Sequence, residues 1–309
     1  MKKHLGIIAL IIVQILSGIN TPLIKNAVNQ MSPFLFGFLR VGIAFAIMLP
    51  IYLVVRRRTT PKKRKKVKAR DLWLTALATF LVYGVANLAF YVGIKQTTSI
   101  NASILVLLWP IIYFLANVEV LKERFSRRTF AGIGLAFVGA LIAVGWPLSN
   151  GFSVAGAVTT GTLLIMVCVV VDVVGTLLLK KSLQRVDTLT TQVIGLGVAT
   201  AFYAIFALPH LPELKLLANP SVLFAVFYGA IMVGCIAYSL GYYALRILKG
   251  SDYSVITYLQ PVVGIISATI ILQESFTPSL LIGTAAVFAG LYLVEARHVG
   301  HPHGHGVHR

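Results

Sequence analysis

The chain has 309 residues, of which 58% are hydrophobic and 12% are charged, and its formal net charge is +18. An ordinary soluble domain is about 25% charged, so this composition, with a mean hydropathy of +0.87, excludes a soluble protein and indicates a membrane protein. The apolar residues recur in runs long enough to cross a bilayer as helices, whereas the strands of a membrane barrel would be short and alternating.

These runs predict an all-α membrane protein with ten transmembrane helices. The first run follows two lysines, as in a signal peptide, but no small-residue cleavage site comes after it, so it is predicted to be a span. The ten predicted spans cover residues 5–25, 33–55, 72–95, 99–121, 129–146, 157–180, 190–208, 221–245, 252–273 and 277–296.

The basic residues are distributed unevenly between the loops. Ten of the 27 Lys and Arg residues lie in RRRTTPKKRKKVKAR, residues 56–70. If this loop is cytoplasmic, 23 basic residues lie on the cytoplasmic side, only Lys25, Lys95 and Lys215 lie opposite, and Arg40 falls within a span. This asymmetry follows the positive-inside rule. It predicts a multi-pass protein of the plasma (inner) membrane, of bacterial or archaeal type, with both termini in the cytoplasm.

The 56–70 loop is predicted to lie against anionic lipids of the bilayer. The alternative is a nuclear-localisation or RNA-binding patch. Because the lipid explanation needs no further assumption, no nucleic-acid partner is predicted.

The remaining candidates for special chemistry are few. Cys168 and Cys235 lie inside apolar spans, where a cysteine behaves as a small hydrophobic residue, so no disulfide is predicted. Residues 298–309, HVGHPHGHGVHR, are rich in His and are predicted to form a flexible cytoplasmic tail; metal binding by these histidines is the alternative. No structural metal and no cofactor are predicted.

The sequence contains an internal repeat. Residues 99–145 match residues 250–296 without a gap, and the match pairs Pro110 with Pro261 and Glu123 with Glu274. A weaker match sets NTPLIK, residues 20–25, beside GTLLLK, residues 175–180. The predicted units are therefore a first repeat at 1–150 and a second at 151–297, each of five helices.

Five is an odd number, so the second repeat is predicted to enter the membrane from the opposite side. The charges agree, because KERFSRR follows the fourth span on the cytoplasmic side, whereas the matching QESFTPS after the ninth span lacks basic residues. Inverted repeats suit a protein that alternates between two related conformations around a central site.

The pattern of apolar run, Pro, apolar run, Glu-bearing loop and Gly-rich helix at 105–145 and 256–296 resembles the drug/metabolite transporter superfamily, and within it the ten-helix EamA-type transporters. The resemblance covers nearly the whole chain. It implies secondary transport of small organic solutes through a cavity lined mainly by the first, third, fourth, sixth, eighth and ninth spans.

Charged groups inside a span are costly and need a partner, water or a function. Arg40, in the second span, is predicted to bind a solute carboxylate or to act as a gate; the alternative is a structural cation that bonds helix-end carbonyls. Asp172, near the middle of the sixth span, is predicted to couple transport to a proton gradient. The alternative is a carboxyl group that stays protonated or bonds a neighbouring helix.

Four charges at span ends are gate candidates: Lys25, Glu123, Lys180 and Glu274. Lys25 and Lys180 occupy matching positions of the repeat, and so do the two glutamates. The alternatives are structural, because lysines at helix ends extend towards the interface and Glu123 has Arg127 one turn further on.

Polar and aromatic residues recur at helical spacing in several spans, which places them on common faces that would line a cavity. For any single Tyr, packing or an interfacial belt is the alternative. Prolines near mid-span free backbone carbonyls where the backbone lines a cavity. The predicted substrate-binding residues are Gln14, Asn20, Arg40, Tyr83, Asn87, Trp109, Tyr113, Tyr238, Tyr242 and Gln260.

The sequence has no Walker motif, no metal-binding His pair on a helix and no serine elbow, so no catalytic residue is predicted and the chain is not expected to be an enzyme. The predicted function is export of small organic solutes, such as amino acids or related metabolites, by a monomer or homodimer. Two alternatives stay open: a multidrug or nucleotide-sugar-type carrier, and an intramembrane lipid-modifying enzyme, which would need paired acidic or His residues at one depth.

Overall fold

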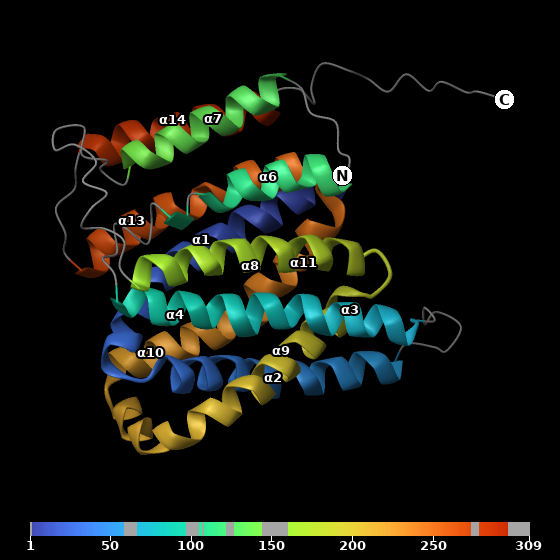
Figure 1. Ribbon diagram of the computed structural model, residues 1–309, viewed down its shortest axis with the longest axis vertical. Helices are drawn as coiled ribbons and strands as arrows, with labels where there is room; N and C mark the ends of the chain where they lie inside the picture. The colour runs from blue at the N-terminus through green and yellow to red at the C-terminus, as the bar shows by residue number, and fades with distance from the viewer. Residues whose placement is uncertain are drawn as a thin grey trace.

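The computed structural model describes residues 2–58, 67–96, 105–106, 108–121, 127–143, 160–272 and 278–295. Every regular element within these ranges is a helix, which confirms the predicted all-α class. The helices run roughly side by side and are stacked in layers, from α2 and α9 at one edge to α7 and α14 at the other (Figure 1).

The elements follow one another with several interruptions of the α-helical geometry. The third and eighth predicted spans each contain a π-helical segment, η2 and η5, between two α-helices. In chain order the elements are α1 (Lys2–Gln30), α2 (Pro33–Arg58), α3 (Ala69–Thr79), η2 (Phe80–Ala86), α4 (Asn87–Gln96), α6 (Leu108–Leu121), α7 (Arg127–Ala143), α8 (Thr160–Ser182), α9 (Thr188–Ala207), η4 (Leu208–Ala218), α10 (Pro220–Tyr228), η5 (Gly229–Ala237), α11 (Tyr238–Ile247), α12 (Gly250–Thr257), α13 (Leu259–Leu272) and α14 (Pro278–Glu295).

Six helical stretches of the described chain are long and apolar enough to cross a membrane, so the protein is multi-pass. They are Lys3–Gln30, Pro33–Arg58, Ala69–Gln96, Thr160–Ser182, Thr188–Ala218 and Pro220–Ile247. The other four predicted spans correspond to α6, α7, the α12–α13 pair and α14, and none of these qualifies within the described residues. The predicted count of ten spans is therefore met only in part.

Local sequence signals explain several helix starts. Asp187 caps α9, because its side chain accepts a hydrogen bond from the Thr190 N–H at 2.9 Å. Asn219 caps α10 in the same way through the Ser221 N–H at 3.0 Å, and Pro220 occupies the first position, where its missing N–H costs nothing.

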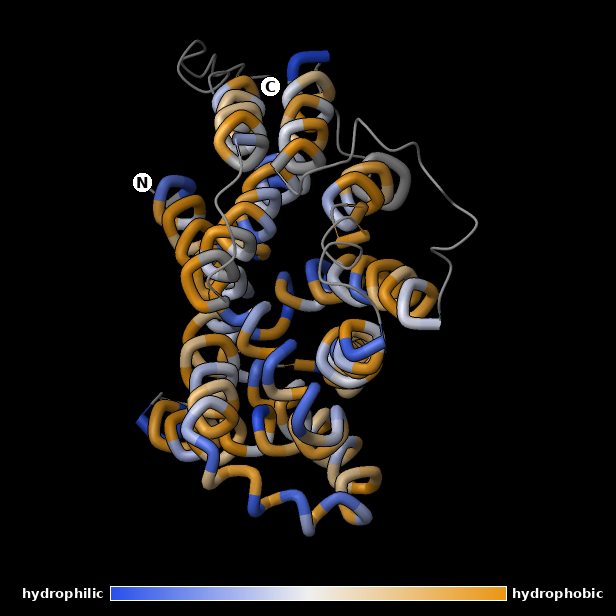
Figure 2. The backbone as a smooth tube through the Cα atoms, turned by 90° about the vertical axis from the view of Figure 1, so that its left-hand side faces the viewer, coloured by the Kyte–Doolittle hydropathy of each residue, from blue (hydrophilic) through white to orange (hydrophobic). Residues whose placement is uncertain are grey.

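The outer faces of the helices are apolar, as contact with lipid requires. On α8, Leu163, Val167, Val170 and Val174 are exposed at helical spacing, while the opposite face is buried. Seen end-on in Figure 2, the helices carry hydrophobic residues throughout the bundle. Exposed apolar faces of this extent would be unfavourable in water and are expected in a bilayer.

The repeated helices α7 and α14 pack against each other reciprocally. A Cβ on Gly139 would lie 2.8 Å from the Gly283 carbonyl oxygen, and a Cβ on Gly290 would lie 2.5 Å from the Gly132 carbonyl oxygen. Since the repeat pairs 132 with 283 and 139 with 290, each glycine contacts the counterpart of the other. The pairs also run in opposite chain directions, so the helices are antiparallel, which is the geometry that an inverted repeat requires.

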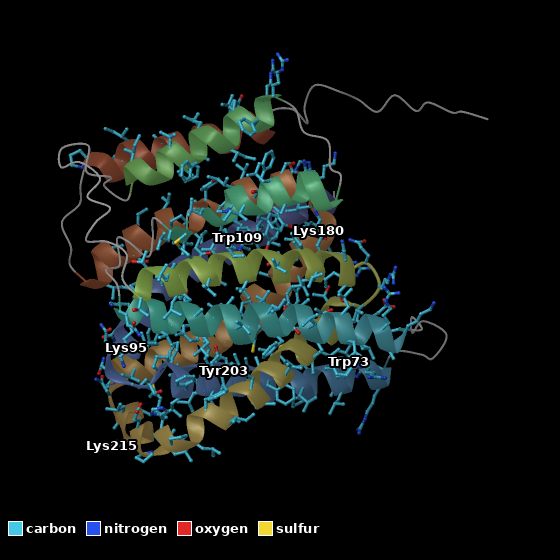
Figure 3. All side chains as sticks on the ribbon, viewed as in Figure 1. Trp73, Lys95, Trp109, Lys180, Tyr203 and Lys215 are labelled. Atoms are coloured by element: carbon cyan, nitrogen blue, oxygen red, sulfur yellow. The ribbon has the colours of Figure 1, made fainter. Side chains whose placement is uncertain are left out.

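Lysine side chains lie at both ends of the bundle (Figure 3). Lys95 and Lys215 lie at one end, and Trp73 and Lys180 lie at the other (Figure 3). The ion pair between Arg185 and Asp71 at 2.9 Å joins α3 to the turn after α8 at the Trp73 end. Four features predicted from the sequence lie outside the described residues. They are most of the basic 56–70 loop, the gate candidates Glu123 and Glu274, the repeat boundary at 150/151 and the 298–309 tail.

Candidate functional site

A cavity of about 270 Å³ lies inside the bundle, and helices from both repeats line it. Its walls come from the predicted first, third, fourth, sixth, eighth and ninth spans, together with Arg40 from the second. The cavity brings together nine of the ten residues predicted to bind substrate: Gln14, Asn20, Arg40, Tyr83, Asn87, Trp109, Tyr238, Tyr242 and Gln260.

Arg40 forms a buried cationic group in the cavity wall. Its side chain is only 3% exposed, and its Nε donates to the Gly229 carbonyl at 3.1 Å. Nη1 donates to the Tyr91 hydroxyl at 2.6 Å, and Nη2 donates to the Tyr238 hydroxyl at 3.4 Å. All of these acceptors are neutral, and no carboxylate of the described chain pairs with Arg40.

The two tyrosines that accept from Arg40 extend its donor surface. Each hydroxyl oxygen acts as an acceptor, and the Tyr238 hydroxyl also accepts from Asn87 Nδ2 at 3.4 Å. Neither hydroxyl proton has an acceptor among the described residues. A guanidinium with unused N–H groups, flanked by two hydroxyl donors, is an arrangement that binds an anion.

Asp172 supplies the opposite charge in the same cavity. Its Oδ2 accepts a hydrogen bond from Trp109 Nε1 at 2.5 Å, which joins α8 to α6. Oδ1 has no donor among the described residues. The carboxyl group is therefore held in place through one oxygen, while the other can meet a solute.

Helix α1 contributes two further buried acceptors to the wall. Gln14 and Asn20 are each 3% exposed, and their side-chain carbonyl oxygens accept no hydrogen bond from the residues that the structure describes. A buried acceptor without a donor is unfavourable unless water or a ligand satisfies it. With Asp172 Oδ1, the cavity thus offers several acceptors for a solute with N–H or O–H groups.

Aromatic rings make up much of the remaining wall. Tyr83 stacks on Tyr238 with ring centroids 4.3 Å apart, and Tyr242 lies 6.1 Å from Tyr83. Trp109 is backed by Tyr113, whose ring stacks on it at 4.8 Å. Tyr113 is fully buried and does not line the cavity. Of the ten residues predicted to bind substrate, it is the one that the structure places behind the cavity wall.

The two gate candidates on described residues, Lys25 and Lys180, do not themselves line the cavity. Lys25 donates to the Ile94 carbonyl at 2.6 Å, so it joins α1 to the last turn of α4 at the Lys95 end. A cation at a helix C-terminus interacts favourably with the helix dipole. Lys180 is buried in the last turn of α8 at the other end of the bundle.

Several residues of the site were not selected from the sequence. Tyr91, Cys168 and Tyr253 line the cavity. Tyr91 shares the helical stripe of Tyr83 and Asn87, and Cys168 precedes Asp172 by one helical turn, so their spacing could have indicated both. Gln192 and Tyr203, which bond the cavity wall from behind, lie in an apolar span without such a pattern.

Among the described residues, no three His, Cys, Asp or Glu side chains are grouped as metal ligands. The His-rich tail lies outside those residues.

Comparisons with known proteins agree with this architecture. The model of the EamA-like transporter family matches the chain twice, at residues 4–145 and 159–296. One solved crystal structure has a TM-score of 0.74 at 19% identity, with 97% of this chain and 99% of that chain covered, a likeness that shows the fold alone.

Relatives of similar length are also found. An uncharacterized transporter of Archaeoglobus fulgidus is 25% identical over 96% of this chain and 87% of its own length. The protein named "Probable amino-acid metabolite efflux pump" in Salmonella typhimurium is 25% identical over 95% of both chains. Because the family model matches nearly the entire sequence in two copies, the chain belongs to the EamA-like transporter family of the drug/metabolite transporter superfamily.

Proposed function

We propose that this membrane transporter is a secondary active carrier that exports small amino acids or related zwitterionic metabolites by alternating access around the central cavity. The observation that carries the proposal is the cavity itself. Among the described residues, its buried guanidinium has no carboxylate partner, and a carboxylate on a different helix has one oxygen without a donor. Arg40, Tyr91 and Tyr238 would bind the solute carboxylate. Asp172, Gln14 and Asn20 would accept from its ammonium group, which has several N–H donors.

The volume of the cavity is compatible with a small solute. At about 270 Å³ it lies just below the range of about 300–1,000 Å³ that is typical of pockets for drug-sized ligands. The cationic Arg40 also disfavours a cationic drug. The rival of another class, a lipid-modifying enzyme, is disfavoured because Asp172 is the only acidic residue that lines the cavity among the described residues.

Orientation and coupling belong to the same proposal. Lys180 and the 56–70 loop would face the cytoplasm of a plasma-type membrane, with anionic lipids against the loop, while Lys95 and Lys215 would face outside. Asp172 would exchange the proton that couples transport to the proton gradient. Lys25 and Lys180 remain candidates for opposite gates.

Three matched solutes test the proposal in proteoliposomes. Alanine carries both charges, propionate lacks the ammonium group, and ethylamine lacks the carboxylate. We expect alanine to be transported and to stabilise the detergent-purified protein against heat, since a ligand that binds only the native state raises its apparent stability. Propionate and ethylamine should compete weakly. Equal binding of ethylamine and alanine, or binding of nucleotide sugars in place of all three, would reject the zwitterion site.

A further inference from the structure

The cavity wall contains two π-helical segments, η2 and η5, at corresponding positions of the two repeats. Adding the repeat spacing of 151 to residues 80–86 gives 231–237, which falls within η5. A π-helical segment widens the helix and shifts the register of everything that follows it, and such segments occur often at functional sites. Asn87 directly follows η2, and Tyr238 directly follows η5.

Helix α9 bonds the carbonyls of both segments. Gln192 is fully buried, and its Nε2 donates to the Gly234 carbonyl at 2.8 Å and to the Cys235 carbonyl at 3.0 Å, both in η5. The Ser239 hydroxyl lies 2.5 Å from Gln192 Oε1 and 2.7 Å from the Cys235 carbonyl oxygen, so its single proton has two acceptors, one on α9 and one on η5. About three helical turns further along α9, Tyr203, also fully buried, donates its hydroxyl to the Gly84 carbonyl in η2 at 3.1 Å.

The helix also approaches the cavity residues closely from behind. A Cβ on Gly195 would lie 2.8 Å from Tyr83 Cε2, so only a glycine there leaves room for the Tyr83 ring. Tyr83 in turn stacks on Tyr238. None of the described cavity-lining residues belongs to α9 itself, so its polar side chains can act on a solute only through the wall they support.

We infer that Gln192 and Tyr203 are positioning residues of the solute site: each holds one π-helical segment open and thereby aims the residue that follows it into the cavity. Gln192 sets the position of Tyr238, which accepts from Arg40 and Asn87. Tyr203 sets the position of Asn87 and of Tyr91, the second hydroxyl partner of Arg40. The link to a solute rests on the proposed function, whereas the link to the π-helical segments rests on the hydrogen bonds alone.

The test compares two variants of α9 with a control on the same helix, Thr200→Val. Gln192→Met and Tyr203→Phe keep a side chain of similar shape but remove its hydrogen bonds to the π-helical segments. Thr200 bonds only the Leu196 carbonyl within α9 at 2.6 Å, so its loss removes a bond without touching either segment. Amide hydrogen exchange should become faster at residues 229–242 in Gln192→Met and at residues 80–91 in Tyr203→Phe, each leaving the other segment unchanged. Thr200→Val should resemble the wild type at both.

Transport gives the second readout. Because small misplacements of a binding group are costly, we expect Gln192→Met to raise the KM for alanine about tenfold, with Vmax per folded carrier close to the wild type. Unchanged exchange at 229–242, or the same increase in Thr200→Val, would overturn the inference. If the Met variant does not fold, Tyr203→Phe decides the inference through the exchange at residues 80–91, because its bond to the Gly84 carbonyl is independent of Gln192. If the wild-type carrier moves none of the solutes, the proposed function fails, while the exchange data still decide the role of α9.

Discussion

Arg40 fills the space into which a side chain at position 229 would project. A Cβ on Gly229 would lie 2.9 Å from Arg40 Cδ and 3.0 Å from its Nε. Gly229 is also the residue whose carbonyl accepts from that Nε. The glycine therefore both admits the guanidinium and holds it, and it does so at the first residue of a π-helical segment.

Gly229→Ala should displace Arg40 and weaken binding of solutes that carry a carboxylate. The added methyl meets a flexible side chain, so we expect the protein to fold and the KM for alanine to rise about tenfold, or about 1.4 kcal/mol. Ethylamine competition should not change. Gly42→Ala is the matched control, because Gly42 does not line the cavity and a Cβ there would lie 3.7 Å from Thr200 Cγ2, an ordinary contact. Equal effects of the two substitutions on alanine transport would contradict this account.

Arg40→Ala tests the anion site directly. Truncating one partner of a buried, hydrogen-bonded charge pair costs about 2–5 kcal/mol of binding free energy. Zwitterionic and anionic solutes should therefore bind far more weakly to Arg40→Ala, whereas the affinity for neutral solutes should change little. Arg56→Ala serves as the control, since Arg56 lies at the exposed end of the same helix and bonds Tyr52. Thermal-shift titrations measure both variants. A uniform loss across charged and neutral solutes would indicate a structural role for Arg40.

Asp172→Asn should separate binding from proton coupling. The amide keeps an oxygen that can accept the Trp109 indole N–H, so the α6–α8 contact should persist. The side chain can no longer gain or lose a proton, and we expect alanine uptake in proteoliposomes to lose its dependence on an imposed pH gradient. Trp109→Phe is the companion variant, because it removes the hydrogen bond but keeps the carboxyl group, and it should retain coupling. A pH-gradient response that survives in Asp172→Asn would refute the coupling role.

Much of this architecture could be predicted from the sequence, because hydropathy and helical spacing are local properties. The all-helical class follows from the length of the apolar runs. Nine of the ten residues predicted to bind substrate line the cavity, since residues one turn apart share a face. Tyr113 shows the limit: it lies on the same face as Trp109, but the two rings stack and only Trp109 reaches the cavity.

The rest depends on contacts between distant segments. The π-helical segments change the register inside otherwise continuous apolar runs, and the hydrogen bonds that hold them come from α9, more than 40 residues away in the case of Gln192 and Gly234. Six of the ten predicted spans correspond to long apolar helices of the described residues. Gln192 and Tyr203 lacked any periodic partner that could have marked them.

Topology can be tested with single cysteines in a Cys168→Ser, Cys235→Ser background. Lys215 and Lys249 are both exposed, and they are predicted to lie on opposite sides of the membrane. We expect Lys215→Cys to react with a membrane-impermeant maleimide in intact cells and Lys249→Cys to react only after permeabilisation. Labelling of both positions from one side would reject the orientation on which the inverted repeat and the proposed direction of transport depend.

The α7–α14 contact offers a test of the repeat that is independent of solute. Gly139→Ala would force a methyl group to within 2.6 Å of the Val287 nitrogen, and backbone cannot move aside as a side chain can. Overpacking of this kind costs about 1–3 kcal/mol, so the melting temperature in detergent should fall. Gly290→Ala should cause a similar fall through Gly132, because the contacts are reciprocal. Gly134→Ala is the control, since a Cβ there meets nothing within 4 Å, and alanine should stabilise the helix slightly. A fall for Gly134→Ala as large as for Gly139→Ala would mean that α7 tolerates no added methyl group anywhere, and the paired glycines would then have no special role.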